Sequence, residues 1–378
     1  MIKNHTREHG DKIAKPPRFE SLQVFRGLAA TAVVLFHTAY LARKQTGQPL
    51  LFTALTPGAS GVDFFFVLSG FIICTSHAKD IGVPERLKAF LYRRFIRIYP
   101  LYLLLTLSLL LLYALGFGHY GAKLQPGVLI RSFLLFPQPP GARPVISAGW
   151  TLAHEALFYG GFAALLCAGR QTRRFICCAF LLLSLLNCLV ILPGPYWIHT
   201  WLFSPYNLEF AAGCWASLIA CRNLVWMLPA GVSYLSVSWY ESSAHSLTLG
   251  DGNPTLMLLL FGIPYWLIIT GAASLEFKKV LHPPGLLVRI GDATYSIYLG
   301  HFTPASALVI LLCKAHVPPL ATVIATSAAV VCIGYCLYRV VELPLLQRMK
   351  AWSPAPSQIT LPSIPNASRS LSIPTIPK

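Results

Sequence analysis

The chain alternates between long apolar runs and short polar connections, and the first long run, residues 22–41, contains one arginine and one histidine. Arg26 lies near the start of this run and His37 near its end. About twenty apolar residues make a helix long enough to cross a bilayer. Because the two side chains are eleven residues apart, a helix places them on nearly the same face, about 16 Å apart along its axis. The pattern predicts a spanning helix that carries a cation and a titratable base on one stripe.

Further apolar runs along the chain have the length of membrane-spanning helices. The second has two small residues, Ser69 and Gly70, at its middle, which permit either close helix packing or a local break. The whole pattern predicts an all-α membrane protein with about ten transmembrane helices. After the first run, the spans are expected at residues 61–76, in the run that follows the basic segment 79–97 and ends near 115, and at 149–169, 175–192, 207–221, 224–240, 255–273, 293–313 and 319–341.

The termini and connections divide the chain into parts. Residues 1–20 form a basic arm that does not read as a cleavable signal, residues 21–345 the transmembrane domain, and residues 346–378 a tail rich in Ser and Pro. We expect both terminal segments to be disordered, because they lack the apolar periodicity of a packed core. The longest connection, residues 116–148, contains an apolar stretch at 128–136 that is too short to span and favours a re-entrant or interfacial piece.

Composition and charge strengthen this interpretation. Of the 378 residues, 55% are apolar and 11% are charged, and the mean hydropathy is +0.60, outside the usual range of soluble proteins. The net charge of +17 is distributed unevenly: with the N-terminus inside, 23 of the 30 Lys and Arg residues fall on the cytoplasmic side. This bias predicts cytoplasmic N- and C-termini in a multi-pass membrane protein. It also accounts for the basic composition without a nucleic-acid partner.

The ten cysteines lie in or beside apolar runs, with no C-x-x-C pair and no matching pair of histidines. Disulfide frameworks and metal sites require such spacing, so we interpret the cysteines as small apolar side chains and predict no metal site. The sequence also lacks G-x-S-x-G, Walker and H-E-x-x-H motifs. Its chemistry must therefore use ionisable groups within the apolar runs, where such groups are costly and usually face a polar interior.

Two arginines at the start of the third span share the expected depth of Arg26. Arg94 and Arg97 are about one helical turn apart, so the three guanidinium groups can form a site for an anionic ligand that enters from the cytoplasm. The planar guanidinium fork suits phosphate well. The alternative is that these arginines anchor the protein at the membrane surface, with Arg26 extended to one interface and His37 near the opposite headgroups.

Two carboxylates lie on the expected side of His37. Asp63 begins the second span, and a carboxylate beside an imidazole would orient it and raise its basicity. Asp63 could equally be a helix N-terminal residue that the helix dipole stabilises. Glu155 lies about one turn inside the fourth span and is either functional or a satisfied structural carboxyl. A weaker candidate stripe, more typical of packing or an interface belt, opens the ninth span with Tyr295, Ser296, Tyr298 and His301.

Seven motifs recur in the order of a known family: Arg26 with His37, GVDFFFVLSGF at 61–71, YRRFIRIYP at 92–100, WTLAHEALFY at 150–159, NLEFAAG at 207–213, IGDATYSIYLGH at 290–301 and VELP at 341–344. Together they resemble the acyltransferase-3 family, integral membrane O-acyltransferases that modify extracytoplasmic carbohydrates and related acceptors. The resemblance covers most of the chain, and it depends on the set of motifs rather than on any single one.

The resemblance implies an acyl-CoA donor, most often acetyl-CoA, that binds from the cytoplasm. The acceptor would be a carbohydrate or glycolipid hydroxyl near the outer face of a bacterial inner membrane, with polysaccharide-synthesis machinery as a partner. With the carboxylate argument above, the expected catalytic residues are His37, Glu155 and Asp63, and the expected donor-binding residues are Arg26, Arg94, Arg97 and Ser69. One position departs from the family, because Glu155 is followed by Ala156 where paired glutamates are common.

The offset between Arg26 and His37 resembles the reach of an extended pantetheine arm. Arginines would hold the CoA phosphates while His37 takes the proton of a sugar hydroxyl that attacks the thioester carbonyl. Direct transfer and an acyl-histidine intermediate both remain open. The competing hypothesis is a transporter or flippase of a glycan or its lipid-linked precursor. Transporters typically contain internal repeats, and the first and last five expected spans show no such correspondence.

Overall fold

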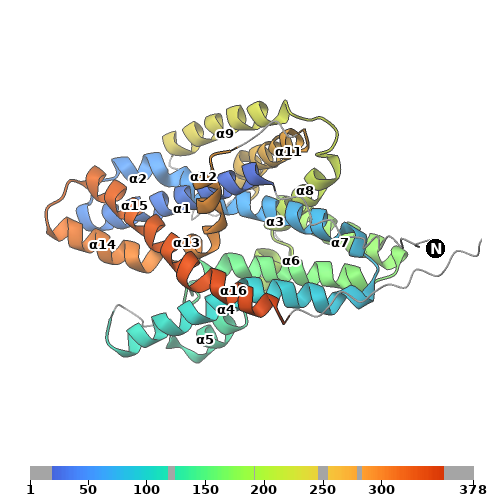
Figure 1. Ribbon diagram of the computed structural model, residues 1–378, viewed down its shortest axis with the longest axis horizontal. Coiled ribbons are helices and arrows are strands. Elements are labelled where there is room, and N and C mark those ends of the chain that lie inside the picture. Colours follow the sequence, from blue (N-terminus) through green and yellow to red (C-terminus); the bar gives the residue numbers. More distant parts are fainter. Residues whose placement is uncertain (1–18, 118–123, 191, 246–253, 279–282, 353–378) are drawn as a thin grey trace, which may run out of the picture.

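The computed structural model describes residues 19–117, 124–190, 192–245, 254–278 and 283–352, and helices are the only regular elements among them. Residues 1–18 of the expected arm and 353–378 of the expected tail lie outside these residues, whereas residues 346–350, expected to begin the disordered tail, are helical. In chain order (Figure 1) the α-helices are α1 (Glu20–Thr46), α2 (Leu50–Leu55), α3 (Gly61–His77), α4 (Leu87–Ala114), α5 (Pro126–Phe133), α6 (Gly149–Cys167), α7 (Arg170–Leu189), α8 (Tyr206–Ile219), α9 (Met227–Ala244), α10 (Pro254–Met257), α11 (Ile263–Phe277), α12 (Gly285–Asp292), α13 (Thr294–Gly300), α14 (Phe302–Lys314), α15 (Pro319–Leu337) and α16 (Leu343–Lys350).

Six helical segments in the described part of the chain are long and apolar enough to cross a membrane, and a seventh crossing results if the bent pair α13 and α14 is one span. Each expected span coincides with a helix or a run of consecutive helices, but α6, α8 and α9 do not meet these criteria. Helix α8 has only 14 residues, and α6 carries His154 and Glu155 in its first half. Ten crossings and cytoplasmic termini therefore stay predictions.

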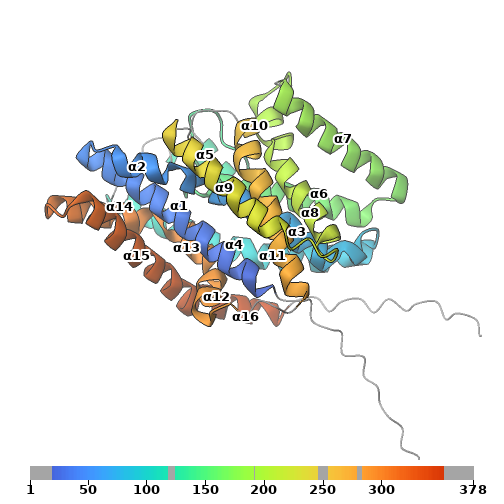
Figure 2. The ribbon, with the colours of Figure 1, turned by 90° about the horizontal axis from the view of Figure 1, so that it is seen from above.

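Outward-facing apolar side chains mark the surface that meets lipid. Helix α7 lies at the edge of the molecule in Figure 2, and only 6% of its 18-residue apolar segment is buried inside the protein. Its exposed side chains include Phe175, Leu182 and Leu189. Proteins in water rarely leave so large an apolar patch uncovered. The helix is therefore suited to a lipid environment.

Helix α1 is packed among other helices, which explains how it can carry ionisable groups. Helices α3, α11, α12, α14 and α15 all contact it. Small side chains such as Ala30 and Val34 are fully buried in these contacts. The approach of α12 is so close that a Cβ on Gly291 would lie 2.0 Å from the backbone oxygen of Gln23. Polar side chains on α1 can thus face protein cavities instead of lipid.

Small residues also determine how α3 meets α8. A Cβ on Gly70 would lie 2.0 Å from the backbone oxygen of Phe210, and one on Gly213 would lie 1.8 Å from that of Val67. Only glycine permits two helix backbones to approach this closely. Helix α3 is continuous through Ser69 and Gly70. Of the two alternatives for these small residues, the structure therefore shows close packing and not a break.

The long connection between α4 and α6 folds back against the helices. Its apolar stretch forms the eight-residue helix α5, which is too short to cross a bilayer. The hydroxyl of Tyr102 on α4 donates a 2.7 Å hydrogen bond to the backbone oxygen of Ser132, and the Ser132 hydroxyl accepts one of 3.1 Å from the backbone nitrogen of Val145. These bonds hold the connection in place as one wall of a pocket described below.

Candidate functional site

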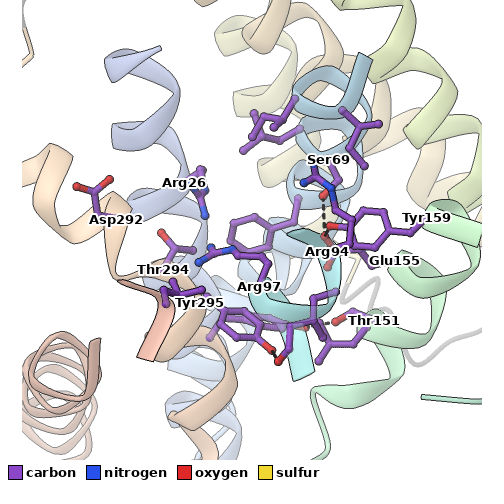
Figure 3. A pocket seen from close by; sticks show the side chains of 18 of the residues that line it. Arg26, Ser69, Arg94, Arg97, Thr151, Glu155, Tyr159, Asp292, Thr294 and Tyr295 are labelled. Atoms are coloured by element: carbon purple, nitrogen blue, oxygen red, sulfur yellow. Dashed lines mark hydrogen bonds between the residues drawn. The ribbon is translucent and has the colours of Figure 1, made fainter. Parts of the chain in front are cut away.

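The N-terminal half of α1 faces a pocket of about 450 Å³, which we call the arginine pocket (Figure 3). Helices α1, α3, α4, α6 and α13 supply its walls, and α16 adds the side chains of Gln347 and Lys350. The four residues expected to bind the donor all line it, and Glu155 lines it as well. The pocket thus brings together Arg26, Ser69, Arg94, Arg97 and Glu155.

Arg97, in the first half of α4, is fixed by a network of polar and aromatic contacts. Its Nη1 donates a 2.6 Å hydrogen bond to Oε1 of Glu342, which is only 2% exposed. The Ser296 hydroxyl donates to the other oxygen of Glu342 at 2.6 Å. The Arg97 guanidinium also lies over the ring of Tyr295, 5.1 Å from its centroid. Glu342 is therefore fully paired, and Arg97 is oriented toward the pocket.

The other two arginines have neutral partners. Arg26 donates to Oε1 of Gln23 at 2.7 Å. The Arg94 guanidinium lies over the rings of Phe90 and Tyr159, 5.4 and 5.5 Å from their centroids. Within the described residues neither arginine forms an ion pair with a carboxylate. Neither guanidinium is held in a direct ion pair, so both can bind phosphate groups.

Glu155 belongs to the arginine pocket. Its Oε1 accepts hydrogen bonds from the Ser69 hydroxyl at 3.3 Å and from the Tyr159 hydroxyl. Figure 3 shows Ser69, Arg94 and Glu155 close together on one side of the pocket. The side chain does not line the cavity around His37. Its expected position on the His37 side is therefore not what the structure shows, and a catalytic role for it stays a prediction.

The C-terminal half of α1 faces a second pocket of about 540 Å³, which we call the histidine pocket. It is lined by His37, His154 and His301, and the connection between α5 and α6 forms one of its walls. Two residues, Val62 and Tyr298, line both pockets. The Tyr298 hydroxyl is hydrogen-bonded to the Thr151 hydroxyl at 3.1 Å. The two cavities are thus neighbours along α1 with a common wall.

His37 is held by a second histidine. Nδ1 of His301 lies 2.6 Å from the backbone oxygen of Tyr298, and its Nε2 lies 3.1 Å from Nδ1 of His37. Nδ1 of His37 is also 3.0 Å from the backbone oxygen of Val33. For two neutral rings, these contacts require a proton on Nδ1 of each, because carbonyl oxygens only accept. Nε2 of His37 then keeps its lone pair, as a general base requires.

Asp63 does not contact His37. It is completely buried and lines neither pocket, it lies within electrostatic reach of Glu209 on α8, and neither of its carboxylate oxygens has a hydrogen-bond partner in the described structure. The partner that orients His37 is instead His301, at the break between α13 and α14, whose axes differ by 59°. The sequence shows His301 in the stripe that opens the ninth span. Its contact with α1 depends on the bend.

Two further residues of the pockets were not singled out from the sequence. His154 is 6% exposed, lines the histidine pocket, and has an Nδ1 atom without a hydrogen-bond partner. It precedes Glu155, and adjacent residues on a helix point about 100° apart, so each faces a different pocket.

Glu342, the partner of Arg97, lies in the VELP motif. Glu342 ends the helical turn that directly follows the apolar run of α15, and a carboxylate in such a position indicates a buried ion pair.

The fold and the site define an integral membrane acyltransferase. A model of the acyltransferase domain of the acyltransferase-3 family matches residues 19–339, and the chain belongs to this family. It is 30% identical over 335 residues to the exopolysaccharide production protein ExoZ of Rhizobium meliloti, a match that covers 84% of this chain and 96% of that protein. It is 27% identical over 323 residues to the acyltransferase MdmB of Streptomyces mycarofaciens, covering 77% and 79% of the two chains. No solved structure matches the chain.

Proposed function

We propose that the protein transfers an acyl group, most often acetyl, from cytoplasmic acyl-CoA to a carbohydrate hydroxyl at the outer face of the bacterial inner membrane. One observation carries the proposal: the arginine pocket and the histidine pocket adjoin along α1 and share Val62 and Tyr298. A donor bound by its phosphates in the first would present its thioester to the base in the second.

The arginine pocket suits CoA. A smaller cavity of about 280 Å³ adjoins it through Asp292 and Tyr338 and is lined by Arg289 and Arg339. Five arginines thus follow one path, which can hold both the 3′-phosphate and the diphosphate of CoA. The pantetheine arm would extend along Ser69 and Glu155 toward Tyr298. We assign Glu155 to orienting the hydroxyls of Ser69 and Tyr159 along this path.

The histidine pocket supplies the base. Nε2 of His37 takes the proton of the acceptor hydroxyl as its oxygen attacks the thioester carbonyl. The carbon–sulfur bond then breaks, and CoA leaves as a thiolate toward the cytoplasm. His301 acts as a positioning residue, because it accepts from Nδ1 of His37 and fixes the tautomer. Asp63 is assigned to the packing of α3 against α8 through Glu209, since it faces neither pocket.

The polysaccharide acceptor is inferred from the name of the relative ExoZ, an exopolysaccharide production protein. The sidedness is inferred from the basic residues, which gather on the side of the arginine pocket. An acceptor on the opposite side would be an exported or lipid-linked glycan. Proteins of polysaccharide synthesis are then natural partners in the same membrane.

The test is CoA release from acetyl-CoA by purified protein with candidate bacterial glycans, together with mass spectrometry of the glycans. We expect glycan-dependent thioester cleavage and a mass increase of one acetyl group, both lost in His37→Ala. A flux of glycan across proteoliposomes without thioester cleavage would contradict the proposal and support the transporter hypothesis. Comparison of surface glycans from cells with and without the gene would identify the acceptor.

A further inference from the structure

The histidine pocket has an unbalanced charge. Its described lining includes two arginines, Arg131 and Arg143, and three histidines, but no aspartate or glutamate. By contrast, the arginine pocket contains Glu155 and Asp292 beside its cations. Neutral sugars need no such cations, because hydroxyl groups can be bound by neutral side chains. The charge of this pocket therefore indicates an acceptor that brings its own negative charge.

Arg131 is held in place by neutral groups. Its Nη1 donates to the backbone oxygen of Pro137 at 3.1 Å and to the Tyr196 hydroxyl at 2.7 Å. The guanidinium also lies 5.9 Å from the ring centroid of Phe136. These contacts fix the side chain without cancelling its charge. A rigid, uncompensated guanidinium is suited to bind a carboxylate or phosphate group.

Arg143 brings its charge close to the catalytic base. It lies on the connection that leads into α6, is exposed, and is within electrostatic reach of His37. It forms no ion pair with a carboxylate in the described part of the chain. An anionic group bound by Arg143 would therefore lie beside the hydroxyl that His37 deprotonates. Arg143 then selects which sugar residue is placed there.

Aromatic rings and one unpaired imidazole complete the pocket. Tyr40, Trp150 and Trp201 line it and offer apolar faces of the kind on which a pyranose ring can pack. His154 is only 6% exposed, and its Nδ1 atom has no hydrogen-bond partner in the described structure. A buried polar atom without a partner is costly. An acceptor hydroxyl would satisfy it.

We propose that the histidine pocket binds an anionic glycan, through Arg131 and Arg143, so that the acylated hydroxyl lies close to a carboxylate or phosphate group of the acceptor. This inference rests on the proposed function for the identity of the pocket as the acceptor site. The negative group has two chemical sources. It is either a carboxylate on a sugar or substituent of the repeating unit, or the phosphate that links a precursor to its lipid carrier.

The experiment measures binding to the purified protein without donor, using three matched probes. They are a neutral gluco-oligosaccharide, the same oligosaccharide with one glucuronate residue, and the same oligosaccharide with a terminal phosphate. A charge-assisted hydrogen bond contributes about 1.5–3 kcal/mol, so we expect at least one anionic probe to bind about 10- to 100-fold more tightly than the neutral probe. The tighter of the two anionic probes identifies the source of the charge.

Two substitutions and a control assign the effect to the pocket. Arg143→Gln should reduce the preference for the anionic probe by about threefold or more, with Arg131 retaining the remainder, and Arg143→Lys, which keeps the charge, should retain most of it. Lys314→Gln removes an exposed charge at the end of α14 outside the pocket and should leave binding unchanged. Equal binding of all three probes, or an equal loss of neutral and anionic binding in Arg143→Gln, would overturn the inference.

The outcome separates this inference from the proposed function. Selective, Arg143-dependent binding without acyl transfer would support the anionic site and contradict the transferase. Acyl transfer to neutral glycans as efficient as transfer to anionic ones would support the transferase and contradict the anionic site.

Discussion

The two pockets along α1 differ in how their charges are arranged. In the arginine pocket, Arg97 is tied to a buried carboxylate, Glu342, and the other guanidinium groups remain available. In the histidine pocket, His37 and His301 contact each other and backbone oxygens, with no carboxylate in the described lining. The first arrangement is suited to bind a polyanion. The second is suited to transfer a proton, because it keeps one imidazole nitrogen unprotonated.

Both pockets depend on helix α1. Arg26 and His37 lie on α1, so packing that fixes one also fixes the other. A ligand that spans the common wall at Tyr298 has its charged end and its reactive end defined by the same rigid element. Substitutions in the two pockets should therefore separate donor binding from chemistry.

Replacing the base should remove chemistry and leave donor binding intact. We expect His37→Ala to lower the turnover number by about 10²- to 10⁴-fold, the usual contribution of general-base catalysis. The KM for acetyl-CoA should change little, because His37 lies outside the arginine pocket. Glycan-dependent CoA release measures both quantities. Turnover above one tenth of the wild-type value would exclude His37 as the base.

Breaking the Arg97 network should affect folding as well as binding. Arg97→Gln leaves Glu342 buried without its cation, which costs about 3 kcal/mol of stability. This is the low end of the usual range, because Arg97 itself is 32% exposed. The double variant Arg97→Gln with Glu342→Gln should recover thermal stability in detergent. It should not recover affinity for acetyl-CoA. Full recovery of donor affinity would show that Arg97 serves only to neutralise Glu342.

Replacing Arg26 on α1, whose hydrogen-bond partner is the neutral Gln23, should affect the donor alone. Arg26→Gln removes one charge-assisted contact, so we expect the KM for acetyl-CoA to rise about 10- to 100-fold. The KM for the acceptor should stay within about twofold. Arg222→Gln, which removes an exposed arginine that does not line the pocket, is the matched control. A larger effect on the acceptor than on the donor would reverse the assignment of the two pockets.

The smallest effect is expected for the positioning histidine. His301→Ala should lower turnover about 10-fold without changing the KM for acetyl-CoA, because it releases His37 but leaves the base in place. His301→Gln can accept from Nδ1 of His37 and should recover part of the activity. Initial rates at saturating donor measure the difference. Equal activities of the Ala and Gln variants would assign His301 to packing.

The sequence predicts which arginines come together in the arginine pocket. Helical periodicity and the expected depth of each side chain in the membrane are sufficient for that prediction. Arg94 and Arg97 follow each other by one turn, and the alternation of basic loops places them at the depth of Arg26. Ser69 joins them through the close packing of α3 with α8, which Gly70 and Gly213 permit. Local patterns therefore contain most of the information for this side of the protein.

The histidine pocket was predicted less completely, because depth in the membrane does not define direction around a helix. Asp63 lines neither pocket and lies within electrostatic reach of Glu209 on α8. Glu155 lines the arginine pocket, while its neighbour His154 lines the histidine pocket. His301 reaches α1 only because the chain bends by 59° between α13 and α14. A bend and a folded connection are long-range features that no periodicity reveals.

The most direct test of the account is a structure of the protein with a non-hydrolysable acetyl-CoA analogue, determined by cryo-electron microscopy. We predict that the phosphates lie among Arg26, Arg94 and Arg97, with the acyl carbon at the Tyr298 wall and directed toward Nε2 of His37. An analogue seated wholly in the histidine pocket, or one whose acyl group points away from Tyr298, would contradict it.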